Sequence, residues 1–390
     1  MNYFAIRRQA LIRNLKKLDS GFDAVLITCP VNVTYLTGFT GESSYVIVTP
    51  KNSILVSDHR FEVQIREECL EIGKGPELEL HIRPHDKTTS DGAAEVLTKL
   101  GAKSVAVEGN RIAISDLEYI RAQATKATFV PQDGMVEALR TVKDMSEVAK
   151  IREAVRVAES AFRMFTATMR PTDTEKEMVD AIDGYLRRAG ARSASFPPIV
   201  AVGERGALPH APPSNLQLED ASKVLIDWGA DLVYKSDLTR CMRSPFVTTP
   251  TRKNKFERVG YSFEEIYTIV LAAQNAAFAE IRPGAKAKDI DAAARKVISS
   301  GKLKNDPKLK LGDHFTHGLG HGIGLEIHES PRIRANSEDV LEAGMVITVE
   351  PGVYIPDWGG IRIEDNVLVT HDGCKLLSTL PREASTLAMA

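Results

Sequence analysis

The chain of 390 residues is 43% hydrophobic and 26% charged, which is ordinary for a globular protein and allows two domains or one large one. Its 50 Lys and Arg residues against 52 Asp and Glu give a formal charge of −2, so no global field attracts nucleic acid or an anionic membrane surface. We therefore expect neither nucleic acid nor a membrane among its partners.

The four cysteines are widely separated and form no Cys-x-x-Cys pair, which is typical of reduced thiols in a cytoplasmic protein. They are Cys29, Cys69, Cys241 and Cys374. Residues 1–18 mix basic and apolar residues without a separate apolar segment, which does not fit a signal peptide. No apolar run approaches the roughly 20 residues of a membrane-spanning helix. The sequence therefore predicts a cytoplasmic protein.

The N-terminal part of the chain alternates between helical and strand patterns. Apolar residues at helical spacing predict a helix over 4–18, and short apolar runs bounded by turn residues predict buried strands. The predicted strands lie at 24–28, 45–49, 53–56 and 104–108. We interpret residues 1–140 as an α/β domain with a mixed sheet.

The pattern changes near residues 139–144, where Asp144 and Glu147 form the capping-box signature of a long helix. From Val148 to Phe165, apolar residues recur in an unbroken three-four spacing, so this helix should be buried along one side. A second helix is predicted to start near Thr174. We place a domain boundary here and assign residues 141–390 to a second domain.

The second domain contains the same succession of elements twice. In each half a helix ends at an Arg-Pro pair, a second helix ends at a glycine, and strands follow; the pairs are Arg170-Pro171 and Arg282-Pro283. This weak internal duplication predicts two related halves about a pseudo-twofold axis, with a site at their junction. A chance match of the two dipeptides is the alternative.

Four acidic residues accompany apolar strand patterns in these halves. Asp227 follows an apolar run, and Asp237 lies on the second strand of a predicted hairpin whose turn is the Gly-Ala-Asp segment 229–231. Glu350 is expected at the end of one buried strand and Glu364 in the middle of another. Buried carboxylates are costly unless they are paired or bind a metal.

Each acid taken alone has a structural interpretation. Alternation along a strand places Arg362 and Glu364 on one face, so an ion pair between them is one alternative and a strand-end cap is another. Together, however, the four acids carry a charge of about −4, which one arginine cannot neutralise and two divalent cations can. Two metals bridged by carboxylates are used in the hydrolysis of amides and phosphates.

A glycine-rich stretch, HGLGHGIGLEIHE over 317–329, contains His317, His321 and His328. Its alternating glycines suit an irregular backbone packed closely around a site, and a turn whose histidines bond the backbone is the alternative. His321 is the natural nitrogen ligand, and oxygen-rich ligation with one imidazole favours manganese, iron, cobalt or zinc over calcium. The stretch matches neither an HExxH zinc helix nor a phosphate-binding loop.

These motifs together resemble those of a known family. The segments LIDWGADLVYKSDLTR, HGLGHGIGLEIHE, VITVEPGVYIP and GGIRIEDNVLV are similar to motifs of the pita-bread metallopeptidases, in the Xaa-Pro aminopeptidase and prolidase branch. NVTYLTGFTG is similar to the creatinase-like N-terminal domain of this branch. The resemblance implies an α/β (α+β) chain, with a creatinase-like domain over 1–140 and a pita-bread catalytic domain with pseudo-twofold symmetry over 141–390.

The resemblance also implies a ligand set for two metal ions. Asp227 would chelate one ion, Asp237 and Glu364 would bridge both, and His321 with Glu350 would complete the second site. Glu350 is in addition the candidate base that acts on water. The ions would be Mn²⁺, with Co²⁺, Zn²⁺ or Fe²⁺ as alternatives.

Four further residues match positions that contact substrate in the family. His210 and His328 would contact the substrate carbonyl and stabilise the tetrahedral intermediate. His317 would transfer a proton and line the proline pocket, and Arg362 would support that pocket and the bridging Glu364. A structural role for each histidine is the alternative.

The implied reaction is hydrolysis of the Xaa-Pro bond, releasing the N-terminal residue from small peptides with proline in second position. An Xaa-Pro dipeptidase, or prolidase, is the alternative, and a homodimer is expected. A more distant alternative is a pita-bread protein without peptidase activity, such as the metal-free creatinase or a module that binds protein or RNA. Such proteins lack some of the five ligands, and this chain lacks none.

Overall fold

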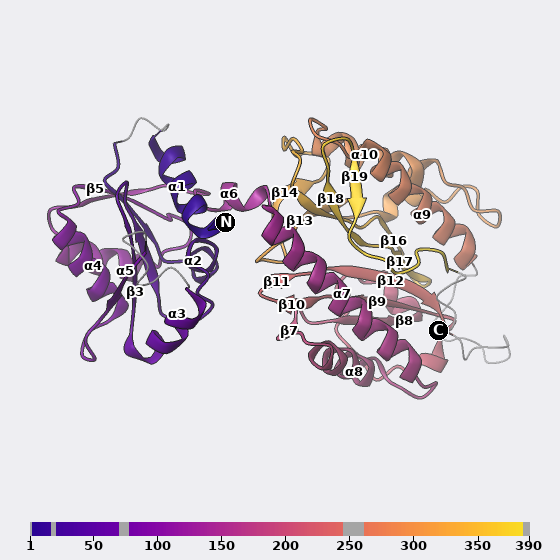
Figure 1. Ribbon diagram of the computed structural model, residues 1–390. Coiled ribbons are helices and arrows are strands. Elements are labelled where there is room, and N and C mark those ends of the chain that lie inside the picture. Colours follow the sequence, from indigo (N-terminus) through magenta and orange to yellow (C-terminus); the bar gives the residue numbers. More distant parts are fainter. Residues whose placement is uncertain (1, 17–20, 70–77, 245–260, 385–390) are drawn as a thin grey trace. The chain divides into compact units, whose positions relative to one another are not determined.

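The chain forms two compact units, Met1–Arg140 and Thr141–Ala390, each with its own sheets and its own hydrophobic core (Figure 1). No helix within the described parts of the chain is long and apolar enough to cross a membrane. The computed structural model describes residues 2–16, 21–69, 78–244 and 261–384.

The first unit contains a six-stranded mixed sheet in the order β4-β3-β2-β1-β5-β6. The β1–β2 and β2–β3 pairs are antiparallel and the other three pairs are parallel. The four predicted strands are confirmed as β1, β2, β3 and β5. The strands are β1 Ala24–Ile27, β2 Tyr45–Val48, β3 Ser53–Ser57, β4 Glu79–Ile82, β5 Ser104–Val107 and β6 Thr128–Pro131.

The helices of this unit include α1 and α2, which lie on either side of β1 in the chain. The predicted helix over 4–18 is confirmed as α1 as far as Lys16, and residues 17 and 18 lie outside the described residues. The helices are α1 Tyr3–Lys16, α2 Pro30–Thr37, α3 Glu62–Glu68, α4 Thr89–Leu100, α5 Ile114–Gln123 and α6 Glu137–Thr141.

A buried carboxylate holds the start of α2. Glu108 Oε2 accepts from the backbone nitrogens of Thr28 (2.7 Å) and Cys29 (2.9 Å), and its Oε1 accepts from the Asn32 side chain (2.6 Å). Burial raises the pKa of Glu108, and these hydrogen bonds oppose that shift. The segment NVTYLTGF therefore forms most of α2 as far as Thr37, and the acid that follows β5 holds the start of this helix.

The second unit contains two helix pairs, and each pair covers its own core. In the first pair, Asp144 and Glu147 form the predicted capping box of α7, and Thr174 with Glu177 forms that of α8. The Trp228 ring stacks on Phe162 of α7 with ring centroids 4.2 Å apart. The two pairs are α7 Met145–Thr168 with α8 Glu175–Arg188, and α9 Phe263–Glu280 with α10 Ala287–Ser300.

The strands of the second unit form four sheets. In order these are β11-β10-β7, β12-β9-β8, β14-β13-β15-β18-β19, and the pair β16-β17. The first two contain β7 Ser193–Ala194, β8 Ile199–Val202, β9 Lys223–Trp228, β10 Ala230–Leu232, β11 Tyr234–Lys235 and β12 Leu238–Arg243. The others contain β13 Gly320–Gly322, β14 Glu329–Ile333, β15 Val346–Val349, β16 Gly352–Ile355, β17 Gly359–Arg362, β18 Asp365–Val369 and β19 Cys374–Leu376.

Two strand predictions in this unit were wrong in detail. The hairpin after Asp227 turns at Val233 rather than at 229–231; Val233 has φ 81°, and its amide donates to Asp231 Oδ1 (2.8 Å). Glu364 does not lie within a strand but between β17 and β18, which belong to different sheets. A continuous apolar pattern does not reveal where a chain crosses from one sheet to another.

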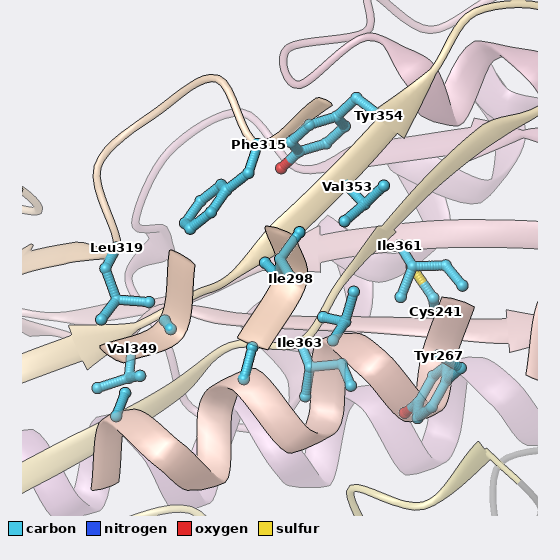
Figure 2. Close-up of a cluster of buried hydrophobic side chains, with 14 of the residues drawn as sticks. Cys241, Tyr267, Ile298, Phe315, Leu319, Val349, Val353, Tyr354, Ile361 and Ile363 are labelled. Carbon is cyan, nitrogen blue, oxygen red and sulfur yellow. The ribbon is translucent and has the colours of Figure 1, made fainter. Parts of the chain in front are cut away.

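Figure 2 shows part of the core of the second unit, a cluster of buried side chains that includes chain neighbours of candidate site residues. Val349, Ile361 and Ile363 are buried side chains from the strand region and pack in one cluster with Ile298 of α10 and Tyr267 of α9. Along the chain these core residues directly precede Glu350, Arg362 and Glu364. Packing of one side chain into the core therefore helps to fix the direction of the next.

Two glycines of the 317–329 stretch allow close approach of strands, and the predicted irregular backbone is confirmed by a register shift at His321 and Gly322. Gly320 and Gly322 lie in β13, and neither has a positive φ. A Cβ atom on Gly320 would lie 2.1 Å from the Thr348 carbonyl oxygen, and one on Gly322 would lie 2.1 Å from that of Ser330. Only glycine fits between these backbones.

We expect Gly322→Ala to lower the free energy of unfolding by about 2 kcal/mol or more, because the backbone of β14 must move to admit the methyl group. Urea denaturation of the purified variants measures this. Gly184→Ala in α8 is the matched control, since nothing lies within 4 Å of the added atom. It should gain about 0.5–1 kcal/mol from helix propensity, and equal effects of the two substitutions would contradict the packing argument.

Candidate metal centre

All nine candidate residues line one cavity of about 670 Å³ in the second unit. Three of them form the tightest group: Asp237, His321 and Glu364 each offer a ligand atom, and these atoms lie within 4.8 Å of one another. All three side chains are buried. The nine residues are His210, Asp227, Asp237, His317, His321, His328, Glu350, Arg362 and Glu364.

The acidic side chains come from strand ends and from sheet crossings. Asp227 lies in β9, and Asp237 immediately precedes β12, its antiparallel partner. Glu350 follows β15 directly, as predicted. Glu364 is held opposite β12 by an isolated bridge to Thr239, in which the Glu364 amide donates to the Thr239 carbonyl (3.1 Å). Two hairpin regions far apart in the sequence thus place their acids in one volume.

The ring of His321 presents an unprotonated nitrogen to the acids. Its Nδ1 lies 3.1 Å from the Gly322 carbonyl oxygen, which can only accept, so the Nδ1 atom carries the hydrogen. The Nε2 lone pair then faces Glu350 Oε1 at 3.5 Å and Asp237 Oδ2 at 3.6 Å. Burial and the neighbouring His328 lower the pKa of His321 to about 3, so the ring is neutral at pH 7.

Arg362 pairs with Asp227 and not with Glu364. Its Nη2 lies 2.5 Å from Asp227 Oδ2, and its Nη1 donates to the Tyr354 hydroxyl (2.9 Å). The predicted Arg362–Glu364 alternative fails because the chain leaves β17 after Arg362, and alternation along one strand no longer applies. Within the described residues, a lysine or arginine therefore pairs with one acid of the cluster, Asp227, and with none of the other three.

Thr239 is a site residue that the sequence analysis missed. Its hydroxyl oxygen lies 2.8 Å from Asp227 Oδ1 and 2.7 Å from Glu364 Oε2, and it accepts from Arg362 Nε (3.0 Å). It stands two residues after Asp237, so strand alternation could have placed it on the same face. This hydroxyl fixes the carboxylates of two separate hairpins relative to one another.

Tyr354 is a second site residue that was not predicted from the sequence. Its hydroxyl forms a hydrogen bond with His317. His317 Nε2 lies 2.8 Å from the Tyr354 hydroxyl, and its Nδ1 lies 2.7 Å from the Gly318 carbonyl. Both ring nitrogens of His317 are thus engaged, which agrees in part with the alternative of histidines bonded to backbone. Burial and the charge of Arg362 lower the pKa of His317 to about 4. Tyr354 lies four residues after Glu350, in a segment whose sequence gave no sign of this contact.

His328 and His210 line the cavity, and their ring nitrogens form no hydrogen bond within the described residues. The His328 ring packs edge-on against His321, with centroids 4.4 Å apart. Burial and the charge of Arg332 lower the pKa of His328. Arg332 and Arg334 also line the cavity, so its wall carries positive as well as negative charge.

The uncompensated acids fit divalent cations. Burial and the charges of neighbouring carboxylates raise the pKa of Asp237 and of Glu364, and burial raises that of Glu350 to about 8. Glu364 Oε1 is buried and has no hydrogen-bond partner within the described parts of the chain. An oxygen of this kind is costly unless a metal binds it, and carboxylates with one imidazole suit Mn²⁺, Co²⁺, Zn²⁺ or Fe²⁺.

Known proteins share this fold and these motifs. The family model described as metallopeptidase family M24 matches residues 149–371, and that of the creatinase/prolidase N-terminal domain matches residues 7–142. The two-domain α/β fold and the acidic site thus define a metallopeptidase of the pita-bread class. The chain belongs to metallopeptidase family M24 and carries the creatinase-like N-terminal domain.

Relatives cover nearly the whole chain. It is 34% identical over 380 residues to the Xaa-Pro dipeptidase of Pyrococcus furiosus, covering 96% of this chain and 99% of that protein. The structure of a Xaa-Pro dipeptidase from Bacillus anthracis matches with a TM-score of 0.83 at 33% identity, covering 97% and 98% of the two chains. That of an X-Pro aminopeptidase from Thermotoga maritima matches with 0.80 at 31%, covering 94% and 98%.

We expect the stability of the metal-free protein to fall between about pH 5 and 8. A carboxyl group whose pKa rises from 4.5 to about 8 on folding stabilises the protein at low pH, and this contribution is lost as the pH rises through the folded value. Metal ions bind the deprotonated acids, so they should restore stability most at the upper end of this range. Melting temperatures with chelator and with Mn²⁺, measured across this range, test this; a metal effect independent of pH would contradict it.

Proposed function

We propose that the protein hydrolyses the peptide bond between an N-terminal residue and a following proline. The observation that carries this proposal is the convergence of three uncompensated buried acids and a neutral imidazole, with an unpartnered oxygen on Glu364, in a chain of metallopeptidase family M24. Relatives named Xaa-Pro dipeptidase and X-Pro aminopeptidase support the choice of proline substrates.

We assign the metal ligands as the resemblance to the family implies them. Asp237 and Glu364 would be shared by two ions, Asp227 would hold one of them, and His321 with Glu350 would hold the other. When bound, the ions act as Lewis acids that polarise the substrate carbonyl and lower the pKa of water. Manganese is our choice among the divalent ions that suit this ligand set.

The protein side chains then supply proton transfer and charge stabilisation. Glu350 would take a proton from the attacking water as a carboxylate, because metal ions bind its deprotonated form. His328 and His210 donate hydrogen bonds to the carbonyl oxygen as negative charge develops on it. His317 lines the proline pocket and moves a proton toward the leaving nitrogen, with Tyr354 as its hydrogen-bonded neighbour.

Aminopeptidase and dipeptidase share this chemistry and differ in what lies beyond the proline. A dipeptide ends in a free carboxylate, and a longer peptide continues. From the family resemblance we expect the aminopeptidase. Arg332 instead favours dipeptides, because its guanidinium lines the cavity close enough to depress the histidine pKa values and has no acidic partner within the described residues.

Arg332→Met should lower kcat/KM for Gly-Pro about 10-fold to 100-fold, the value of a lost charge-assisted hydrogen bond, and leave a longer Gly-Pro peptide within about threefold. Steady-state assays on both substrates measure this. Arg282→Met, an exposed arginine that does not line the cavity, is the control. If wild-type enzyme cleaves the longer peptide better and Arg332→Met affects both equally, the enzyme is the aminopeptidase.

Glu364→Ala should abolish turnover and lower metal content, whereas His328→Ala should retain the metals and lose about 100-fold in kcat. Elemental analysis after gentle purification, with kinetics on the same samples, separates the two effects. The exposed Glu338→Ala serves as a control for loss of a carboxylate. Loss of metal in His328→Ala would contradict its assignment, and a wild-type chain without metal would favour a binding module.

We further propose a cytoplasmic homodimer. The cysteines of the described residues are free thiols, in support of a reducing compartment. Light scattering on the metal-loaded protein gives the oligomeric state.

A further inference from the structure

The loop that carries His210 has little regular structure of its own. It follows β8 and contains a short 3-10 turn, Gly203–Ala207, before reaching Ser214. His210 itself is exposed, and its ring makes no hydrogen bond within the described parts of the chain. The position of this histidine therefore depends on what holds the loop backbone.

A buried carboxylate, Glu175, binds both ends of this loop. Its Oε1 accepts from the Val202 amide (2.8 Å) before the loop, and its Oε2 accepts from the Ser214 amide (2.8 Å) after His210. Arg205, within the loop, donates its Nε to the same carboxylate (2.9 Å) and an Nη to the Pro212 carbonyl. Glu175 has no exposed surface. One acid thus ties the two sides of the loop together.

The opposite face of the loop rests on the hairpin that carries Arg362. A Cβ on Gly360 would lie 1.9 Å from the Gly206 carbonyl oxygen, so the two backbones are in direct contact. Arg362 Nη1 lies 3.4 Å from the Pro209 carbonyl, next to His210. The loop is therefore fixed between Glu175 on one side and a site residue on the other.

Glu175 is not needed to start its own helix. Thr174 and Glu177 form the capping box of α8, with the Glu177 amide donating to Thr174 Oγ1. Burying a carboxylate at this position is costly, and the hydrogen bonds from the loop and Arg205 offset that cost. The contacts of Glu175 with Val202, Arg205 and Ser214 explain why a carboxylate is buried at this position.

We propose that Glu175, with Arg205, is a positioning residue that sets His210 against the substrate carbonyl. The inference rests on the proposed function of His210, and it adds a residue of α8 that does not line the cavity. Glu175→Gln keeps the size of the side chain but replaces one acceptor oxygen with a donor. It must therefore release Ser214 or Val202.

The test is a double-mutant cycle on the metal-loaded enzyme with a Xaa-Pro substrate. Glu175→Gln should lower kcat roughly 10-fold to 100-fold with little change in KM and no loss of metal. In the His210→Ala background the same substitution should cost less than about twofold, because the residue through which it acts is gone. Hydrogen exchange of the 203–214 amides should accelerate in Glu175→Gln.

Two comparisons keep the outcome interpretable. Glu108→Gln changes a buried carboxylate with the same kind of amide contacts in the first unit, and it should lower stability while leaving kcat within about twofold. Arg205→Lys, which removes the bidentate contact, should reproduce the kinetic effect if Glu175→Gln fails to fold.

The outcomes separate this inference from the proposed function. If the losses in kcat of Glu175→Gln and His210→Ala multiply in the double variant, Glu175 has no positioning role, and the peptidase proposal is unaffected. A normal kcat in both Arg205→Lys and Glu175→Gln would lead to the same conclusion. A normal kcat in His210→Ala would overturn both the assignment of His210 and this inference. A fully metal-loaded wild-type enzyme without Xaa-Pro activity would overturn the proposed function. In that case hydrogen exchange still tests the role of Glu175, because unchanged exchange of the 203–214 amides in Glu175→Gln would show that Glu175 does not fix the loop.

Discussion

The mutual repulsion of buried carboxylates is the constraint on which the second unit depends. Asp227, Asp237, Glu350 and Glu364 share one cavity, and a single guanidinium, that of Arg362, bonds directly to one of them. Burial, and then this excess of negative charge, raises the pKa of Glu364, whose Oε1 has no hydrogen-bond partner within the described residues. A cluster of this kind is stable only when protons or metal ions neutralise it, so folding, metal binding and catalysis are coupled through the same atoms.

The rest of the site is built to hold that cluster in place. Thr239 joins the carboxylates of Asp227 and Glu364, and the core side chains next to Glu350 and Glu364 anchor their backbones in the core that α9 and α10 share. The loop of His210 is held in the same way, since we infer that Glu175 fixes its backbone. Preorganisation by many small contacts is how such sites keep ligand geometry.

Much of the fold followed from local patterns. Four of the six first-unit strands, the capping box of α7, the start of α8 and the strand before Glu350 were predicted, because propensity and periodicity are local properties. The hairpin turn at Val233 and the break at Glu364 were not predicted. A β-branched residue at positive φ contradicts its own propensity, and only the surrounding sheets impose it.

The sequence by itself determined which residues could form the centre, because acids within apolar strands and histidines in a glycine frame are costly unless they serve a site. Only the tertiary structure decided their partners: that Arg362 neutralises Asp227 rather than Glu364, that Tyr354 engages His317, and that the glycines of β13 accommodate neighbouring backbones. The reason is physical, since pairing depends on distances between strands that are far apart in the chain, and no local pattern encodes those distances.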